Sequence, residues 1–399
     1  MFKILGLDII RFLKGIIYMK KIALVGSTGS IGRQVISVVM RHPDRFKITA
    51  LIADTSSDAL LGQINALSPE YAVLCNPSQG DIRGAIKTST AFFTGADSAL
   101  KVLEDCGADV IFVACGGFAG LKYSLKALKL NIPLALANKE TLVCGGDLVA
   151  SFNGEIMPVD SEHSAIWQCL NFDRKAQFER LVITASGGAF RGRKWDTLSA
   201  VTPEEALRHP TWKMGAKITV DSATLLNKGY EVIEAHHLYG CGYDRIETVI
   251  HPQSIVHSMV KFADGACLAQ TGYPTMELPI QLALTYPERL DCGLNQLDFT
   301  RPLSLEFLPL ERKEYPLYDL ALACGEQGGI LPTVLNACSE VSVGAFLKGE
   351  IPLTDVYTVA SEVVSGTANC RVESFEQLSE VDRLARARAL KIIKEGRGG

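Results

Sequence analysis

The chain has 399 residues, which is enough for two or three domains with substantial buried cores. Its 40 basic and 44 acidic residues are interspersed and give a formal net charge of −4. This balance argues against a nucleic-acid partner and points to an enzyme or binder of small molecules. The 11 cysteines form no CxxC pair and no metal spacing with histidine, as expected for reduced thiols in the cytoplasm.

The first 18 residues are apolar, but four charged side chains interrupt them: Lys3, Asp8, Arg11 and Lys14. The stretch 1–18 is therefore too short and too charged to span a membrane, and no small-residue cleavage site follows it. A strand-like run begins directly after Met19. We therefore expect translation to begin at Met19, with residues 1–18 an upstream misreading of the start site. The alternative is that residues 1–18 form an amphipathic helix on the protein surface.

The remaining chain divides into three regions of an α/β protein. Residues 19–164 alternate short β-rich runs with helical stretches, which predicts a Rossmann-like parallel sheet that binds a dinucleotide. Residues 165–300 mix strands with helices and predict an α+β catalytic domain. After a proline-marked linker at 301–316, residues 317–396 are helical in pattern and predict a small bundle. The strands expected in the first region are KIALVG, FKITALIA, YAVLC, VIFVAC and PLALAN.

The glycine-rich run GSTGSIG at residues 26–32 lies between a strand-like and a helix-like stretch. Its glycines allow a tight turn, and the backbone amides of Thr28, Gly29, Ser30 and Ile31 can bind a pyrophosphate at the helix N-terminus. The spacing differs from GxGxxG. The position after the first strand nevertheless predicts a dinucleotide site.

The end of the second predicted strand reads IADTSSD and bears on the choice of cofactor. Asp54 stands where an acidic residue binds the free 2′-hydroxyl of NADH and repels the 2′-phosphate of NADPH. Thr55, Ser56 and Ser57 could instead donate hydrogen bonds to a phosphate. These residues alone favour NADH and leave NADPH open.

A polar helix is predicted after Ser222, which stands at its N-cap position. Asn227, Lys228, Glu231 and Glu234 follow at spacings of three and four residues, so a helix gathers them on one side. A hydroxyl, an amide and an ammonium near a helix N-terminus suit a phosphate, and Glu231 offers a hard oxygen to a divalent metal. The alternative is an ordinary solvated face.

The motif MPVDSEH supplies two more carboxylates. Asp160 and Glu162 are two residues apart, so in an extended chain both side chains leave the same face, and Glu231 can provide a third ligand. Three carboxylates without a thiolate suit Mg²⁺ or Mn²⁺ better than zinc. A surface pair is the alternative. Five histidines are interpreted as structural: His163, His236, His237, His251 and His257.

Together with GSTGSIG and the helix after Ser222, four further motifs occur in a fixed order: ALANKETLV at 135–143, MPVDSEHSAIWQ at 157–168, TASGGAFR at 184–191 and HPQSIVHSMV at 251–260. From about Met19 to the C-terminus the series resembles the 1-deoxy-D-xylulose 5-phosphate reductoisomerase family of isoprenoid biosynthesis. The resemblance implies NADPH as cofactor, a divalent metal, a homodimer and a phosphorylated small-molecule substrate.

The resemblance also implies roles for single residues. It assigns the cofactor to Asn138, Glu140 and Gly215 and the metal to Asp160, Glu162 and Glu231. It places His209 in a mobile loop near 206–216, where an aromatic side chain can exclude water from a bound substrate. Catalytic roles fall to Lys139, Glu162 and His209. The substrate-binding residues are Lys139, Ser161, Glu162, Ser186, His209, Ser222, Asn227, Lys228 and Glu231.

The reaction implied by the resemblance joins a carbon-skeleton rearrangement to a hydride transfer. In the retro-aldol interpretation, cleavage of the C3–C4 bond of the substrate leaves an enolate. The metal and the ammonium of Lys139 stabilise its negative charge. Recombination gives a branched aldehyde, which the nicotinamide reduces to 2-C-methyl-D-erythritol 4-phosphate.

Two alternatives remain. A plain NAD(P)-dependent dehydrogenase would need the glycine-rich loop but not the carboxylates, and a silent cofactor sensor would lack catalytic residues that this chain retains. Thr275 and Glu277 depart from the family pattern and bear on local packing or dimer contacts.

Overall fold

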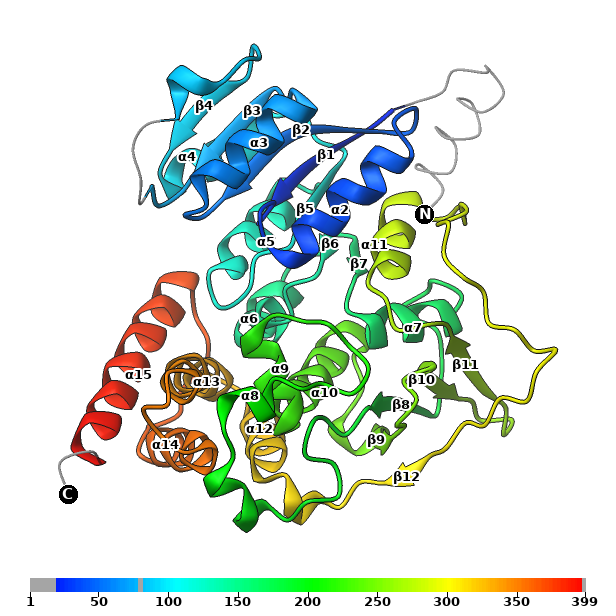
Figure 1. Cartoon of the computed structure of the whole chain (residues 1–399), viewed down its shortest axis with the longest axis vertical. Helices are drawn as coiled ribbons and strands as arrows, with labels where there is room; N and C mark the ends of the chain where they lie inside the picture. The colour runs from blue at the N-terminus through cyan, green and yellow to red at the C-terminus, as the bar shows by residue number, and fades with distance from the viewer. Residues whose placement is uncertain (1–18, 78–81, 397–399) are drawn as a thin grey trace.

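The computed structural model describes residues 19–77 and 82–396. The proposed extension 1–18 lies outside these residues. None of the helices described is long and apolar enough to cross a membrane. The chain builds a seven-stranded sheet, a smaller five-stranded sheet with its helices, and a helical bundle (Figure 1).

The seven-stranded sheet is parallel throughout, with strand order β4-β3-β2-β1-β5-β6-β7. Five of its strands lie where the apolar runs predict them, while β4 and β7 are additional. The confirmed strands are apolar because helices cover both faces of the sheet. The strands are β1 (Lys20–Val25), β2 (Phe46–Ala53), β3 (Tyr71–Leu74), β4 (Ala91–Thr94), β5 (Val110–Val113), β6 (Leu134–Leu136) and β7 (Ile156–Pro158).

Two layers of helices enclose this sheet. One core joins α2 and α3 to the sheet through Val35, Leu60 and Ile64, and the other joins α4 and α5 through Leu103 and Ala127. The arrangement confirms the doubly wound α/β fold. The helices are α2 (Ser30–Arg41), α3 (Ser57–Leu67), α4 (Ala96–Asp105), α5 (Gly120–Lys129) and α6 (Glu140–Ala150).

The order of the strands fixes where a ligand can enter. From β1 the chain runs outward through β2 and β3 to β4, and it then crosses back to β5 on the other side of β1 and runs outward to β6 and β7. The loops after β1 and β5 therefore diverge, and they open the crevice in which doubly wound proteins bind dinucleotides.

The second sheet is mixed, with strand order β11-β10-β8-β9-β12. Only β8 and β9 pair in parallel, and the other pairs are antiparallel. The strands are β8 (Arg180–Ala185), β9 (Ile246–Ile250), β10 (Val256–Lys261), β11 (Cys267–Thr271) and β12 (Leu308–Pro309), and the helices are α7 (Ser161–Cys169), α8 (Pro203–Ala206), α9 (Ala216–Ala223), α10 (Leu226–Tyr239) and α11 (Glu277–Thr285).

Two details bear on the sequence interpretation, and the first of them differs from it. The short strand β12 lies inside the predicted linker 301–316, because its two residues add an edge to β9. Glu277, one of the departures from the family pattern, begins α11 and forms an ion pair of 2.6 Å with Arg41 of α2. It therefore helps to join α11 to the first sheet.

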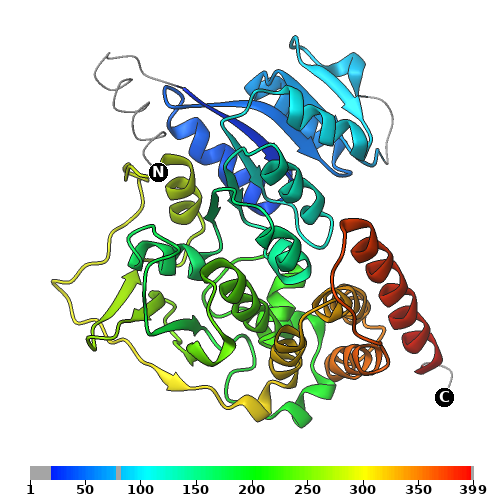
Figure 2. The ribbon, with the colours of Figure 1, turned by 180° about the vertical axis from the view of Figure 1, so that it is seen from behind.

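The C-terminal residues form four helices that pack beside α6 and α9 (Figure 2). Their core includes Leu335 and Cys338 of α13, Val356 of α14 and Ala389 of α15. The helices are α12 (Pro316–Gln327), α13 (Leu331–Leu347), α14 (Leu353–Ser365) and α15 (Phe375–Gly396). The 3₁₀ helices are η1 (Arg83–Ala85), η2 (Trp195–Ala200), η3 (Tyr243–Arg245) and η4 (Arg312–Glu314).

Candidate active site

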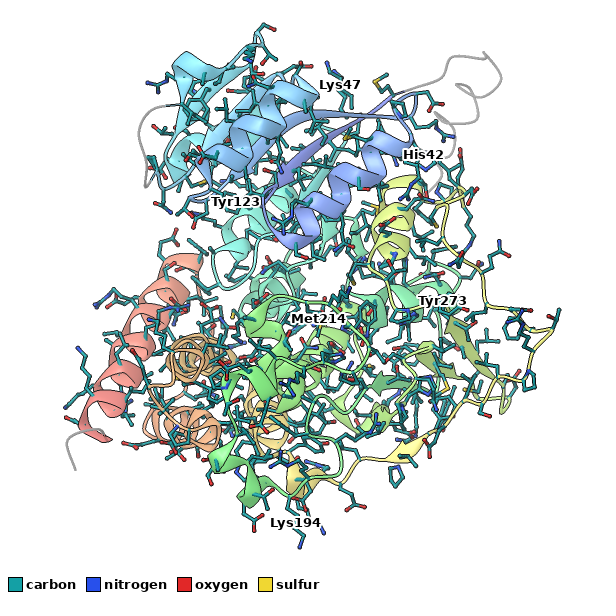
Figure 3. All side chains as sticks on the ribbon, viewed as in Figure 1. His42, Lys47, Tyr123, Lys194, Met214 and Tyr273 are labelled. Atoms are coloured by element: carbon teal, nitrogen blue, oxygen red, sulfur yellow. The ribbon has the colours of Figure 1, made fainter. Side chains whose placement is uncertain are left out.

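One cavity of about 680 Å³ collects most of the predicted site residues. It lies where the carboxyl ends of the first sheet meet α7, α9 and α10. The segment between α8 and α9 crosses this region, and Figure 3 shows its Met214 near the middle of the view. The predicted residues that line it are Gly29, Ser30, Ile31, Lys139, Glu140, Asp160, Ser161, Glu162, Ser186, His209, Gly215, Ser222, Asn227, Lys228 and Glu231.

Three carboxylates and two ammonium groups form the buried centre of the cavity. Ligand oxygens of Asp160, Glu162 and Glu231 lie within 4.8 Å of one another. Lys139 Nζ lies 2.7 Å from Asp160 Oδ2 and 3.1 Å from Glu231 Oε1. Lys228 Nζ lies 2.7 Å from Glu162 Oε1 and also contacts Glu231. The donor set is hard and compact, so it fits a divalent cation such as Mg²⁺.

The charges of this cluster depend on one another. Burial alone would lower the pKa of Lys139, but the carboxylates of Asp160 and Glu231 outweigh it and hold this pKa well above its usual value. Burial alone would raise the pKa of Asp160, but the Lys139 ammonium keeps it low. Burial and the charge of Glu162 raise the pKa of Glu231. Lys139 is therefore a fixed positive charge and not a proton acceptor.

Asp160 and Glu162 come together differently from the prediction. Their stretch is not extended: Asp160 is the N-cap residue of α7, and Glu162 lies in its first turn. The expectation that the two side chains leave one face of a strand was therefore wrong. They converge because β7 ends at Pro158 and α7 starts three residues later, which turns both side chains towards Glu231 of α10.

Ser222 also has a different local role. It lies near the end of α9 and does not cap the helix that carries Asn227 and Lys228, so that prediction was wrong. The cap position of α10 is Leu225, which adopts a left-handed conformation with φ of 55°. The break between the two helices still brings Ser222 and Asn227 to the same cavity.

Ser222 belongs to a small network around His209. The Nε2 atom of His209 lies 3.0 Å from Ser186 Oγ and 3.1 Å from Ser222 Oγ. Its Nδ1 atom accepts hydrogen bonds from the backbone amides of Thr211 at 3.2 Å and Trp212 at 2.9 Å. The two amides require a lone pair on Nδ1, which places the ring proton on Nε2. Burial, and then the charge of Lys228, lower the pKa of His209 to about 4.

The glycine-rich loop follows β1 as predicted. Gly26 has a φ of +83°, and a Cβ atom there would lie 2.5 Å from the backbone nitrogen of Cys115 in the loop after β5. A Cβ atom at Gly32 would lie 2.2 Å from the Gly26 carbonyl oxygen. The glycines therefore allow two close approaches. Gly29, Ser30 and Ile31 line the cavity at the start of α2, whereas Thr28 does not.

Asn138 and Glu140 support the loop after β5. Asn138 is buried and donates from Nδ2 to the Gly117 carbonyl at 3.0 Å and to Glu140 Oε2 at 2.7 Å. Glu140 Oε1 accepts a 2.9 Å hydrogen bond from the Gly117 amide. Glu140 lines the cavity, whereas Asn138 lies behind it.

Asp54 directly follows β2, at the carboxyl edge of the sheet, and is exposed. Its Oδ1 accepts a 2.6 Å hydrogen bond from Asn76 Nδ2. Asp54, Thr55 and Ser56 do not line the 680 Å³ cavity, so the predicted ribose end lies further along the edge.

Several residues at the site were missed by the sequence analysis. His257, interpreted as structural, lines the cavity, and its ring centre lies 5.9 Å from that of Trp212. Lys217, Asp221 and Glu340 also line the cavity. The motif HPQSIVHSMV contains His257, but only the pairing of β10 in the sheet shows on which side its ring lies.

His163 and Glu234 form a buried pair behind the carboxylates. His163 Nε2 lies 3.1 Å from Glu234 Oε2, and with Asp160 they form a second group whose ligand atoms lie within 4.8 Å of one another. Burial raises the pKa of Glu234 to about 7, although His163 acts in the opposite direction. Glu234 and Glu231 lie on the same helix, but Glu234 pairs with His163 and not with the lysines of the cavity.

Sequence profiles of one enzyme family match three consecutive stretches of the chain. The profile of 1-deoxy-D-xylulose 5-phosphate reductoisomerase matches residues 22–146, and profiles of C-terminal domains of that enzyme match residues 156–239 and 271–388. The enzyme of Exiguobacterium sibiricum is 43% identical over 375 residues, which cover 92% of this chain and 98% of that protein. The chain belongs to the 1-deoxy-D-xylulose 5-phosphate reductoisomerase family.

Solved structures agree with this assignment. A 1-deoxy-D-xylulose 5-phosphate reductoisomerase from Zymomonas mobilis in complex with NADPH superposes with a TM-score of 0.86 at 34% identity, covering 94% of this chain and 99% of that one. A DOX-P reductoisomerase in complex with NADPH, fosmidomycin and magnesium gives a TM-score of 0.87 at 34% identity, covering 96% and 100%. The resemblance predicted from the sequence is confirmed.

Proposed function

We propose that this member of the reductoisomerase family converts 1-deoxy-D-xylulose 5-phosphate into 2-C-methyl-D-erythritol 4-phosphate with NADPH and a divalent cation. The observation that carries the proposal is the meeting of three groups in one cavity. The carboxylates Asp160, Glu162 and Glu231, the polar network around His209, and the glycine-rich loop after β1 all line it. A dehydrogenase that acts by hydride transfer alone needs only the glycine-rich loop.

We assign the metal to Asp160, Glu162 and Glu231. When bound, the cation polarises the substrate oxygens and the nicotinamide supplies a hydride. The buried ammonium of Lys139 stays charged beside Asp160, so it can stabilise negative charge that develops on the substrate. Ser161, which directly precedes Glu162 in α7, can donate a hydrogen bond to the substrate near these groups.

We assign the substrate phosphate to Ser186, Ser222, Asn227, Lys228 and His209. Because His209 is neutral and donates from Nε2, it can order the two serine hydroxyls without adding charge. Lys228 supplies the positive charge, which a dianionic phosphate requires. Magnesium or manganese would compete with Lys228 for Glu162 and Glu231 and so free its ammonium for the phosphate.

We assign water exclusion to the segment between α8 and α9. Trp212, Met214 and Gly215 line the cavity. The amides of Thr211 and Trp212 bind His209, so the segment and the phosphate network are linked. Closing the segment over the substrate would remove water from the reacting atoms.

For the cofactor we assign Thr28, Gly29, Ser30 and Ile31 to the pyrophosphate, with Asn138, Glu140 and Gly215 nearer the nicotinamide. Asp54, Thr55 and Ser56 would meet the ribose end. NADPH remains the proposed cofactor, although Asp54 weakens its advantage over NADH.

The proposal is tested by incubating the purified protein with 1-deoxy-D-xylulose 5-phosphate and Mg²⁺ or Mn²⁺ and either reduced nicotinamide. Loss of nicotinamide absorbance together with formation of 2-C-methyl-D-erythritol 4-phosphate is the expected result. Turnover that persists in excess chelator would favour the plain dehydrogenase. NADPH binding without consumption of either substrate would favour the silent sensor.

We also propose that the protein is a cytoplasmic homodimer. Each protomer would have three domains, formed by residues 19–164, 165–300 and 317–396. The strand β11 ends its sheet and exposes Leu268, and the segment before β12 exposes Phe299 and other apolar side chains. An exposed edge strand beside apolar residues is a surface that a second copy could cover. Leu268→Lys should weaken the dimer, and light scattering measures the change in mass.

The cysteines support the proposed compartment. All 11 of them are free thiols, as expected for a protein in the reducing cytoplasm.

A further inference from the structure

The loop after β5 is one wall of the cofactor crevice, and the C-terminal bundle reaches it. Gly116 and Gly117 of this loop line the cavity together with Glu340 of α13. Glu340 comes from the bundle, which lies more than 200 residues further along the chain. The family resemblance assigned no role to this part of the protein.

The contact between the loop and the bundle is close. The amide of Phe118 donates a 3.3 Å hydrogen bond to Glu340 Oε1. A Cβ atom at Gly117, whose φ is +74°, would lie 2.7 Å from the same oxygen, so a side chain there would strain the backbone and displace the carboxylate. The ring of Phe118 also stacks on Phe375 of α15, with 5.7 Å between centres and 8° between planes.

The bundle holds the carboxylate of Glu340 in place. Asn336 Nδ2 donates to Oε1 at 2.9 Å, and Arg386 of α15 donates from Nη2 to Oε2 at 2.6 Å. Asp382 in turn accepts from Arg386 Nε at 2.7 Å and from Nη2 at 3.0 Å. A guanidinium held by two carboxylates has a fixed orientation, so it can fix the carboxylate that it binds.

The loop is therefore held from two sides. Glu140 accepts from the Gly117 amide on the side of α6, and Glu340 accepts from the next amide on the side of α13. The loop in turn meets the glycine-rich loop, since a Cβ atom at Gly26 would lie 2.5 Å from Cys115 nitrogen. Movement of the loop after β5 would change the width of the crevice.

We propose that Glu340, held by Arg386, is a positioning residue for NADPH: it fixes the loop Cys115–Phe118 against the crevice and so couples the C-terminal bundle to cofactor binding. The inference rests on the proposed function for the identity of the cofactor. It assigns Glu340 no contact with the reacting atoms.

The test measures NADPH affinity by fluorescence titration without turnover. Glu340→Gln keeps the size of the side chain but loses the charge that binds Arg386 and the Phe118 amide. We expect it to raise the Kd for NADPH about tenfold, with KM for 1-deoxy-D-xylulose 5-phosphate nearly unchanged. Glu380→Gln is the matched control, because it removes a carboxylate from an exposed ion pair with Arg383 on α15. The control should bind NADPH as the unaltered protein does.

Arg386→Gln provides a second variant should Glu340→Gln fold poorly. It should weaken NADPH binding in the same direction, and the double variant should be no weaker than the worse single variant, because both act through one carboxylate. Hydrogen exchange of residues 114–118 without ligand should be faster in both variants than in the control.

Unchanged NADPH affinity and unchanged exchange in folded Glu340→Gln would overturn the inference. So would a uniform fall in stability with no selective effect on the loop, since that would make Glu340 a packing residue only. An unaltered protein that binds NADPH but does not convert 1-deoxy-D-xylulose 5-phosphate contradicts the proposed function and leaves this inference standing.

Discussion

Lys228 of α10 donates a hydrogen bond to Glu162 of α7, with 2.7 Å between Nζ and Oε1. The same ammonium contacts Glu231, one turn further along its own helix. Lys228 thus forms ion pairs with two carboxylates that are proposed to bind the metal, although its own proposed role is to bind the substrate phosphate. Metal and substrate would therefore both act on this ion pair.

Lys228→Met should affect substrate binding and metal dependence together. A charge-assisted hydrogen bond to phosphate is worth about 1.5–3 kcal/mol, so KM for the substrate should rise at least tenfold while the Kd for NADPH stays the same. The variant also leaves Glu162 and Glu231 buried without this counterion, which costs about 3–5 kcal/mol. The melting temperature should fall without metal and recover more strongly with Mg²⁺ than that of the unaltered protein.

Lys261→Met is the control for this experiment. Lys261 pairs with Glu247 at 2.7 Å on the exposed side of the second sheet, and exposed pairs contribute little to stability. A KM for the substrate that does not change in folded Lys228→Met would remove this residue from the phosphate site.

Glu231→Gln should separate chemistry from cofactor binding. The change keeps the shape of the side chain but removes one ligand charge, and the kcat should fall about a hundredfold or more. The Kd for NADPH should stay within about twofold, because the glycine-rich loop that we assign to the pyrophosphate is untouched. Activity that survives in both this variant and excess chelator would contradict the metal assignment.

The sequence predicted the members of this site better than their local geometry. Residue type and spacing were enough to propose the three carboxylates, whereas Lys139 was proposed only through the family resemblance. The pattern could not show that Asp160 begins a helix, because its dipeptide spacing is also compatible with a strand. The pattern also misplaced the start of the helix at Ser222, because a hydroxyl before a polar helical pattern resembles an N-cap residue. In the structure the N-cap residue is Leu225, which has a left-handed backbone conformation.

The fold shows the same division. Apolar runs identified β1, β2, β3, β5 and β6, because strands buried on both faces are continuously hydrophobic. The edge strands β4 and β11 were not recognised, since their residues are largely exposed and carry no such pattern. The strands β7 and β12 were missed because three and two residues are too few to show a pattern. The contact of Glu340 with the loop after β5 depends on packing between segments that are distant in sequence.

His209 should titrate far below an ordinary histidine. Burial and the charge of Lys228 lower its pKa to about 4, and protonation of Nδ1 would break two hydrogen bonds to backbone amides. Because the folded pKa lies below the unfolded value of about 6.5, this group disfavours the folded state as the pH falls from about 6.5 towards 4. Its contribution to stability is complete above about pH 6.5.

Histidine resonances of labelled protein measure this directly, with His209→Gln used to assign the signal. A midpoint near pH 4 is expected, and a midpoint near 6.5 would contradict the neutral ring. The kcat/KM of the unaltered protein should accordingly show no ionisation of His209 between pH 6 and 8.

Asp54 should limit the preference for NADPH over NADH. It follows β2 at the carboxyl edge of the sheet, and Asn76 Nδ2 binds its Oδ1 at 2.6 Å. A carboxylate facing the ribose would oppose a 2′-phosphate, so Asp54→Asn should shift the ratio of kcat/KM values towards NADPH by about tenfold for each ~1.4 kcal/mol of repulsion removed. The shift should shrink at high salt because Asp54 is exposed. Asp58→Asn, in the first turn of α3, removes the same charge four residues away and should change the ratio much less. An equal ratio in both variants and the unaltered protein, at low and high salt, would show that Asp54 does not face the cofactor.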